Sequence, residues 1–113
     1  GMNMAVAARR LGVGPRVLGR VGSDTHALEA MNFMAAEGLD TSTLARDELS
    51  GSSGVILRTP GGGNSIAVDL GANGRLSPAD IDAGRGLFAS ASVVLAPLEV
   101  PPATVEHAFR LAK

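Results

Sequence analysis

The sequence contains no cysteine, no tryptophan and no tyrosine. Without cysteine the chain forms no disulfide, no thiolate zinc site and no cysteine nucleophile, and this composition is typical of a cytoplasmic protein. Phe, Trp and Tyr together make up only 3% of the residues. Because the bases of a single-stranded nucleic acid stack on aromatic side chains, we do not expect nucleic acid as a partner.

The chain also lacks an excess of charge of either sign. Its 10 Lys and Arg and its 11 Asp and Glu are interspersed and leave a net charge of -1. No basic stripe is therefore available for a phosphate backbone or an anionic membrane. No apolar run reaches the length of about 18 residues that a membrane span needs, and the N-terminus lacks the charged-then-apolar order of a signal peptide. We expect a cytoplasmic protein with no membrane partner.

What is present is enough for one small domain, because 45% of the 113 residues are hydrophobic. Helical patterns alternate with strand-like apolar runs. Helices are expected at 3–11, at 25–37, from Ser77-Pro78 onward, and from Pro101 or Pro102 to Ala112. Strands are expected at 16–22 and 91–96, with a polar connector at 41–50. This order predicts an α/β fold with a parallel sheet and helices on its faces.

Local signals mark the ends of these helices. Asn3 is of a residue type that caps helix N-termini and is predicted to cap the first helix, and Ser23 or Asp24 is predicted to cap the second. Ser77 is predicted as a cap, with Pro78 at the first helical position. Gly38 is predicted to end the second helix, with Leu39 closing a Schellman-type contact.

A hairpin is predicted between the two halves of the chain. Residues 53–59 and 64–70 are both β-like, and the Pro-Gly-Gly-Gly sequence at 60–63 between them is a turn. The glycines lack the Lys-Ser/Thr of a phosphate-binding loop, so this turn is not read as a phosphate cradle. We interpret the hairpin, at about 51–72, as an insertion that serves as a lid.

Polar side chains follow the apolar runs at two places. Gly71-Ala72-Asn73 comes after the second hairpin strand, and Leu98-Glu99 comes after the run at 91–96. In open α/β sheets ligands bind at the edge formed by the carboxyl ends of the strands, where these side chains are expected to lie. Glu99 is therefore favoured as a ligand contact over a solvated carboxylate near a helix start, whereas Asn73 is favoured as a left-handed turn residue.

Four stretches, in order and over essentially the whole chain, resemble the ribokinase (PfkB) family of carbohydrate kinases. Residues 1–12 resemble the end of the family's N-terminal Gly-Gly signature, and Val21-Gly22-Ser23-Asp24 with the following helix resembles the next β-α unit. Ser53-Gly54-Val55 and the hairpin resemble the lid strands. The Gly71-Ala72-Asn73 and Leu98-Glu99 steps complete the set.

The resemblance implies a ribokinase-like α/β fold, here a partial parallel sheet flanked by helices with a small β-hairpin lid. It implies transfer of the γ-phosphate of ATP to a sugar hydroxyl. Asn3 and Glu99 match residues that hydrogen-bond the sugar hydroxyls, and Gly1 belongs to the same signature. Gly54 and Val55 match lid residues that cover the sugar, while Asp24 and Asn73 are weaker substrate-binding candidates.

Other parts of the family pattern are missing from the sequence. The first strand with its sugar-binding Asp, the Gly-Ala-Gly-Asp motif with the catalytic base, and the Asn-x-x-Glu motif linked to magnesium are all absent. The resemblance thus implies that 1–113 is a partial, N-terminal-to-middle segment. ATP and Mg²⁺ are implied for the whole enzyme and neither is expected on this segment, which is predicted to be inactive alone.

Two other functions stay open at this point. One is a non-catalytic module that binds a sugar or nucleoside with the same fold. The other is a segment that forms a homodimer through the lid, because an exposed strand edge is a template for pairing. A metal site is not expected, because His26 and His107 have no third ligand at metal spacing and are read as surface histidines.

Overall fold

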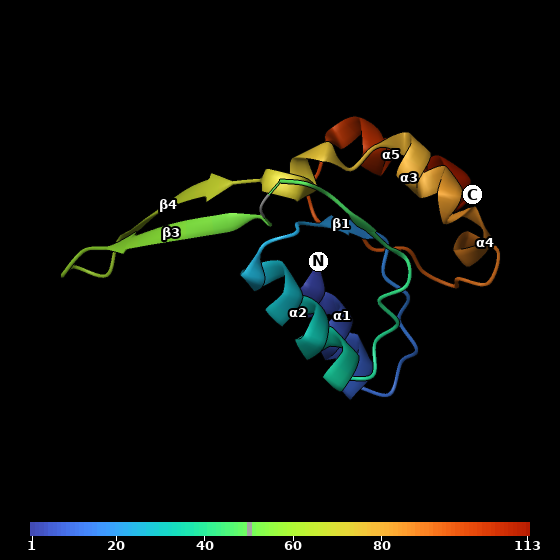
Figure 1. Ribbon diagram of the computed structural model, residues 1–113, viewed down its shortest axis with the longest axis horizontal. Helices are drawn as coiled ribbons and strands as arrows, with labels where there is room; N and C mark the ends of the chain where they lie inside the picture. Colours follow the sequence, from blue (N-terminus) through green and yellow to red (C-terminus); the bar gives the residue numbers. More distant parts are fainter. Residues whose placement is uncertain (50) are drawn as a thin grey trace.

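A short parallel sheet lies at the centre of the computed structural model, which describes residues 1–49 and 51–113 (Figure 1). Its strands are β1 (Gly19–Val21) and β2 (Leu44–Arg46), and α2 (Thr25–Ala36) connects them. The register runs from Gly19 beside Leu44 to Val21 beside Arg46. The remaining elements are α1 (Met2–Arg10), β3 (Ser53–Arg58), β4 (Asn64–Asp69), η1 (Gly71–Arg75), α3 (Pro78–Ala83), α4 (Arg85–Phe88) and α5 (Pro102–Leu111).

The helices form one hydrophobic cluster on each side of this sheet. The first cluster joins α1 and α2 and is centred on Val6, Met34 and Leu39. The second joins α3 and α5 and is centred on Leu76, Ile81 and Ala108. Val17 packs on the first cluster and its neighbour Leu18 on the second, as expected where successive side chains of extended chain point to opposite faces. The expected α/β fold is thus confirmed.

The predicted ends of α2 are confirmed. Asp24 caps the helix by accepting a hydrogen bond from the backbone N–H of Ala27 at 2.7 Å. At the other end Gly38 has φ +76°, and the N–H of buried Leu39 donates to the carbonyl of Met34 at 3.0 Å. This is the Schellman arrangement, in which a left-handed residue ends the helix and the next residue returns its side chain to the core.

The start of α3 also follows from its sequence. The Ser77 side chain accepts from the N–H of Asp80, and the Asp80 side chain in turn accepts from the N–H of Ser77 at 2.8 Å. This reciprocal pair is a capping box, with Pro78 at the first helical position as predicted.

The predicted hairpin is present and projects away from the helices (Figure 1). β3 and β4 pair antiparallel, from Ser53 beside Asp69 to Arg58 beside Asn64. Every residue of both strands is exposed, so the hairpin does not pack into either hydrophobic cluster. Its projection makes the molecule elongated, with extents of 48 × 30 × 27 Å.

The structure corrects two strand predictions. Residues 91–96 form no strand, and Val93 and Leu95 are 73% and 71% exposed. A strand exists only through hydrogen bonds to a neighbour. The sheets among the described residues are β1–β2 and β3–β4, so this segment has no such neighbour there. Conversely, the predicted polar connector at 41–50 contains β2, which pairing with β1 creates.

The two asparagine predictions are also corrected. Asn3 does not cap α1, because the helix begins one residue earlier, at Met2, and Gly1 is the N-cap. Asn73 is not a left-handed turn residue. It lies in the 3₁₀ helix η1, and among the described residues only glycines have positive φ. The left-handed position in this turn is taken instead by Gly71, with φ +45°.

Candidate functional site

Folding brings the first and last of the sequence motifs together. The backbone nitrogen of Gly1 lies 3.9 Å from Oε2 of Glu99, although the two residues are far apart in the sequence. Glu99 lies in the loop that leads into α5, and its side chain is 68% exposed. Asn3 is exposed in the first turn of α1, two residues from this contact. The carboxylate of Glu99 and the carboxamide of Asn3 are therefore both open to solvent.

The two lid residues singled out in the sequence lie on opposite faces of the hairpin. Gly54 pairs with Val68 and Val55 with Ala67, and neighbouring residues of a strand point in opposite directions. One face carries Ile56, Ile66 and Val68, and the other carries Val55, Leu57 and Ala67. A substrate under one face therefore meets Val55, and a substrate under the other face meets Gly54. Gly54 has no side chain and offers that face only its backbone.

Asp24 lies where the hairpin joins the body of the protein. Besides capping α2, its carboxylate accepts a hydrogen bond from the N–H of Gly51 through Oδ2 at 3.0 Å. The backbone N–H groups of Ala27 and Gly51 hold the pKa of the Asp24 carboxyl below its ordinary value. The carboxylate is thus occupied by the protein itself, so the predicted cap is confirmed and a direct substrate contact is not visible in this arrangement.

Asn73 is engaged at the same junction. Its Nδ2 donates to Oγ of Ser52 at 3.0 Å, which links η1, just after β4, to the residue just before β3. Asn73 is half-buried. In this structure it therefore holds the two ends of the hairpin together.

A charged cluster next to this junction was not singled out in the sequence. Arg20 on β1 donates through Nε and Nη2 to both carboxylate oxygens of Asp80, at 3.0 and 2.9 Å. Its Nη1 donates to Oδ2 of Asp47 at 2.7 Å, and Nε of Arg75 lies 3.3 Å from the same oxygen. Arg75 and Asp80 are five residues apart, but Arg20 and Asp47 are far from them and from each other in the sequence, so the fold brings the cluster together.

The hydrogen bonds of this cluster keep its members charged. The Arg20 guanidinium, followed by the Ser77 hydroxyl and N–H, holds the pKa of Asp80 at about 2, below its ordinary 3.8. The N–H of Leu49, followed by Arg20 and Arg75, lowers the pKa of Asp47, whose side chain is only 1% exposed. The pKa of Arg20 is raised chiefly by Asp80 and then by Asp47. These groups bind one another and leave no free acid or base for chemistry.

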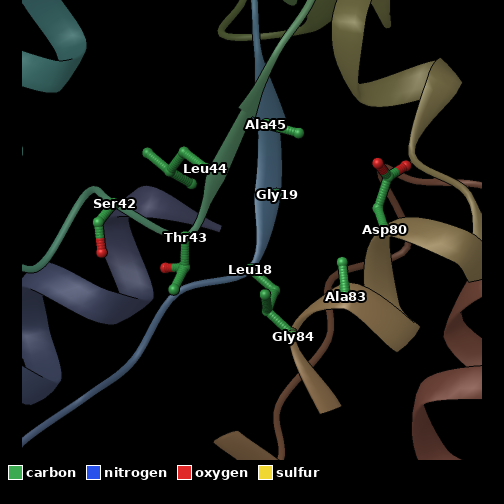
Figure 2. Close-up of a pocket in the computed structure, with 9 residues that line it drawn as sticks. All are labelled: Leu18, Gly19, Ser42, Thr43, Leu44, Ala45, Asp80, Ala83 and Gly84. Atoms are coloured by element: carbon green, nitrogen blue, oxygen red, sulfur yellow. The ribbon is translucent and has the colours of Figure 1, made fainter. Parts of the chain in front are cut away.

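A cavity of about 270 Å³ lies away from all the residues predicted as a site (Figure 2). Leu18 and Gly19 at the start of β1, and Thr43 and Leu44 at the start of β2, line one side. Asp80 and Ala83 of α3, with Gly84 just after it, line the other. Ligands of parallel sheets bind at the carboxyl ends of the strands, and this cavity is at the opposite end. We do not assign the substrate to it.

Metal ligands do not gather in the described residues, where no group of three or more His, Asp or Glu could hold an ion. The Nε2 of His107 lies 3.1 Å from Oδ1 of Asp82, and His26 is almost fully exposed. Across the described residues no helix is both long and apolar enough to cross a membrane.

The fold is a parallel sheet between helices with a projecting two-stranded hairpin. Residues 1–113 match the pfkB family carbohydrate kinase throughout. The chain belongs to this family, which confirms the resemblance stated from its motifs.

Proteins similar to this chain are named as ribokinases and deoxyribokinases. The chain is 34% identical over 115 residues to a ribokinase of Haemophilus influenzae, covering 100% of this chain and 37% of that protein. A deoxyribokinase of Salmonella typhi is equally similar, with 34% identity and the same coverage. The Arabidopsis thaliana ribokinase complexed with ribose and ATP superposes with a TM-score of 0.79 at 22% identity, over 100% of this chain and 38% of that one. The chain thus spans a little over a third of these relatives.

Proposed function

We propose that this chain is the sugar-binding part of a cytoplasmic, ATP-dependent carbohydrate kinase of the ribokinase type. The observation that carries this proposal is the approach of Gly1 to Glu99 within a chain that matches the pfkB family over all its residues. These two residues come from the first and the last of the sugar-binding motifs. The names of the relatives, ribokinase and deoxyribokinase, support a small sugar as the substrate.

Each proposed contact has a chemical reason. The carboxylate of Glu99 accepts hydrogen bonds only, whereas the carboxamide of Asn3 both donates and accepts. Together they suit adjacent sugar hydroxyls, each of which donates one hydrogen bond and accepts others. The hairpin, with Gly54 and Val55, would cover the sugar and keep water from the phosphoryl donor.

We assign the binding of ATP and Mg²⁺ to residues other than Asn3, Glu99 and the hairpin. ATP with Mg²⁺ supplies the transferred phosphoryl group, and in-line transfer of this kind depends on positioning and charge stabilisation. The described residues contain no metal-binding group, and the Gly-rich turn at 60–63 lies at the exposed tip of the hairpin. We therefore assign this chain only the binding and covering of the sugar, and we expect the purified chain to have no kinase activity.

The test begins with the DNA on both sides of the coding segment. An upstream strand with an Asp and Gly-Gly and a downstream Gly-Ala-Gly-Asp motif are expected. The complete protein should then phosphorylate ribose or fructose with ATP. A complete protein that binds a sugar without phosphorylating it would instead support the non-catalytic module, and one that binds no sugar would contradict both. If the 113 residues alone phosphorylate a sugar with ATP, the proposal that this chain only binds and covers the sugar is wrong.

A second candidate function, homodimerisation through the lid, is favoured by one observation. The face with Ile56, Ile66 and Val68 leaves these side chains 59%, 56% and 59% exposed. A two-stranded hairpin with apolar side chains on both faces is marginal in water without a cover. A second copy of the same hairpin would provide it.

A further inference from the structure

The hairpin depends on its roots for its orientation. All twelve residues of β3 and β4 are exposed, so packing against the body does not hold them. The two roots, the segment before β3 and the segment after β4, are instead tied to each other. Asn73 donates to Ser52 at 3.0 Å, and Arg75 lies 3.3 Å from Asp47. The hairpin with its roots thus forms one unit. Arg20 on β1 binds Asp47, and η1 with its fully buried Ala72 packs against β1, so both hold this unit against the body. A further link holds the root next to β3.

Asp24 makes that link with both of its carboxylate oxygens. Oδ1 accepts from the N–H of Ala27 at 2.7 Å, inside α2, and Oδ2 accepts from the N–H of Gly51 at 3.0 Å, in the first root. The preceding residue adds to it, because Ser23 donates from its backbone N–H to the carbonyl of Leu49 at 3.3 Å. The loop after β1 and the root of β3 are therefore held side by side at one carboxylate.

We propose that Asp24 is a positioning residue that, through its bond to Gly51, helps to set the angle of the lid relative to the body. A carboxylate is needed because one oxygen serves the helix and the other serves the lid root. A side chain with a single acceptor oxygen at the place of Oδ1 can cap α2, and it leaves no oxygen at the place of Oδ2 for Gly51. That the lid so held covers a sugar rests on the proposed function. The hinge role of Asp24 does not.

Two variants separate the bond from Asp24 to Gly51 from the bond to Ala27 that caps α2. Asp24→Asn and Asp24→Ser both keep a good N-cap acceptor for Ala27, and both remove the second carboxylate oxygen. Asp40→Asn is the matched control. Asp40 also accepts a backbone hydrogen bond two residues on, from Ser42 at 2.9 Å, and its other described partner is Arg16, so none of its described bonds goes to a lid root.

Hydrogen exchange followed by NMR measures the two bonds separately. In the unmodified chain the amide of Gly51 should be protected, and an amide that exchanges as fast as an unstructured one would overturn the proposal without any variant. In Asp24→Asn we expect the protection of Gly51 to fall about tenfold or more, as for a hydrogen bond to a charged group. The protection of Ala27 should stay within about twofold, and Asp40→Asn should change neither. Unchanged protection of Gly51 in a folded Asp24 variant would contradict the proposal.

The angle itself is measured between two spin labels. Because the chain has no cysteine, Gly61→Cys at the hairpin tip and Asn32→Cys on the exposed side of α2 place the labels uniquely. The distance distribution should broaden in Asp24→Asn and stay as in the parent in Asp40→Asn. If the distance distribution has the same width in the parent, in Asp24→Asn and in Asp40→Asn, Asp24 does not position the lid.

Titration with ribose then separates this inference from the proposed function. If Asp24→Asn loosens the lid and weakens ribose binding, both stand. A loosened lid in a chain whose parent binds no ribose would leave the hinge standing and count against the proposed function. If the parent and a variant with a loosened lid bind ribose equally tightly, the lid angle has no part in holding the sugar.

Discussion

Arg20 on β1 and Asp80 on α3 are 60 residues apart in sequence and joined by two parallel hydrogen bonds, of 3.0 and 2.9 Å. The side chain of Asp80 is 16% exposed and that of Arg20 is 22% exposed. Asp80 also completes the capping box of α3. One carboxylate therefore begins a helix and ties it to the central sheet, close to the root of the lid.

Replacing Asp80 should destabilise the chain strongly. Asp80→Ala leaves the Arg20 guanidinium without its bidentate partner and removes half of the capping box, and a lost hydrogen bond to a charged group costs about 1.5–3 kcal/mol. We expect the free energy of unfolding in urea to fall by about 2–4 kcal/mol. Asp82→Ala, on the same helix with a side chain 47% exposed, is the control, and its change should stay below about 1 kcal/mol. Equal effects of the two substitutions would show that the pair contributes little.

The same carboxylate should make stability depend on pH in acid. The folded-state pKa of Asp80, about 2, lies below its ordinary value of 3.8. A depressed carboxyl pKa stabilises the fold fully above pH about 4, and this contribution is lost as the pH falls from about 4 to about 2. The difference corresponds to about 2 kcal/mol. Urea unfolding at a series of pH values should show this loss, and Asp80→Asn should flatten the curve over that interval. A variant with the parent's full slope would place the titration on other groups.

Local features of the fold could be predicted from the sequence, and contacts between distant segments could not. Gly38, Leu39 and the Ser77-Pro78 step form their structures with residues within a few positions, so their types are sufficient to predict them. β2 was missed because its three residues become a strand only by pairing with β1. The run at 91–96 was wrongly predicted as a strand for the converse reason, since its apolar residues predict burial and not a pairing partner.

The residues of the candidate site also fall into local features that the sequence predicts and distant contacts that only the fold shows. Glu99 and Gly1 were singled out through motifs, and their approach needed the fold. The cap role of Asp24 could be predicted because it is local, whereas its bond to Gly51 spans 27 residues. Arg20 gave no signal in the sequence, because a charged residue in a short strand is ordinarily read as exposed.

Gly38→Ala tests the end of α2. A residue with a side chain at φ +76° adopts the left-handed region at a cost of about 1–2 kcal/mol, and the added Cβ would lie 3.1 Å from Nη2 of Arg9. The midpoint of urea unfolding should fall accordingly. Gly14→Ala is the control, because a Cβ at that position meets no atom within 4 Å and the backbone is not left-handed. It should be neutral or slightly stabilising. A larger loss at Gly14 than at Gly38 would contradict the Schellman account.

Ile66→Lys tests association through the lid. Ile66 lies directly opposite Ile56 on the hairpin face that also carries Val68, so a charge there interrupts the apolar surface at its centre. If the parent chain dimerises in light scattering as its concentration rises, Ile66→Lys should remain monomeric. Val55→Lys, on the opposite face, should still associate. A parent that stays monomeric at high concentration would remove lid pairing as a function, and loss of association by Val55→Lys alone would assign the contact to the other face.

Glu99→Ala tests the sugar contact proposed for the last motif. The side chain is largely exposed, and Oε2 lies no closer than 3.9 Å to the backbone nitrogen of Gly1. Its removal should therefore leave the thermal midpoint almost unchanged. Ribose binding by calorimetry should weaken about tenfold or more, because a carboxylate that accepts hydrogen bonds from sugar hydroxyls is a charged partner. Glu106→Ala is the control, since Glu106 is equally exposed and lies on α5, one turn beyond its start. Loss of binding in both variants would indicate a non-specific effect of charge. Full binding by Glu99→Ala would remove Glu99 from the site and leave Asn3 and the lid as the remaining candidates for the sugar contact.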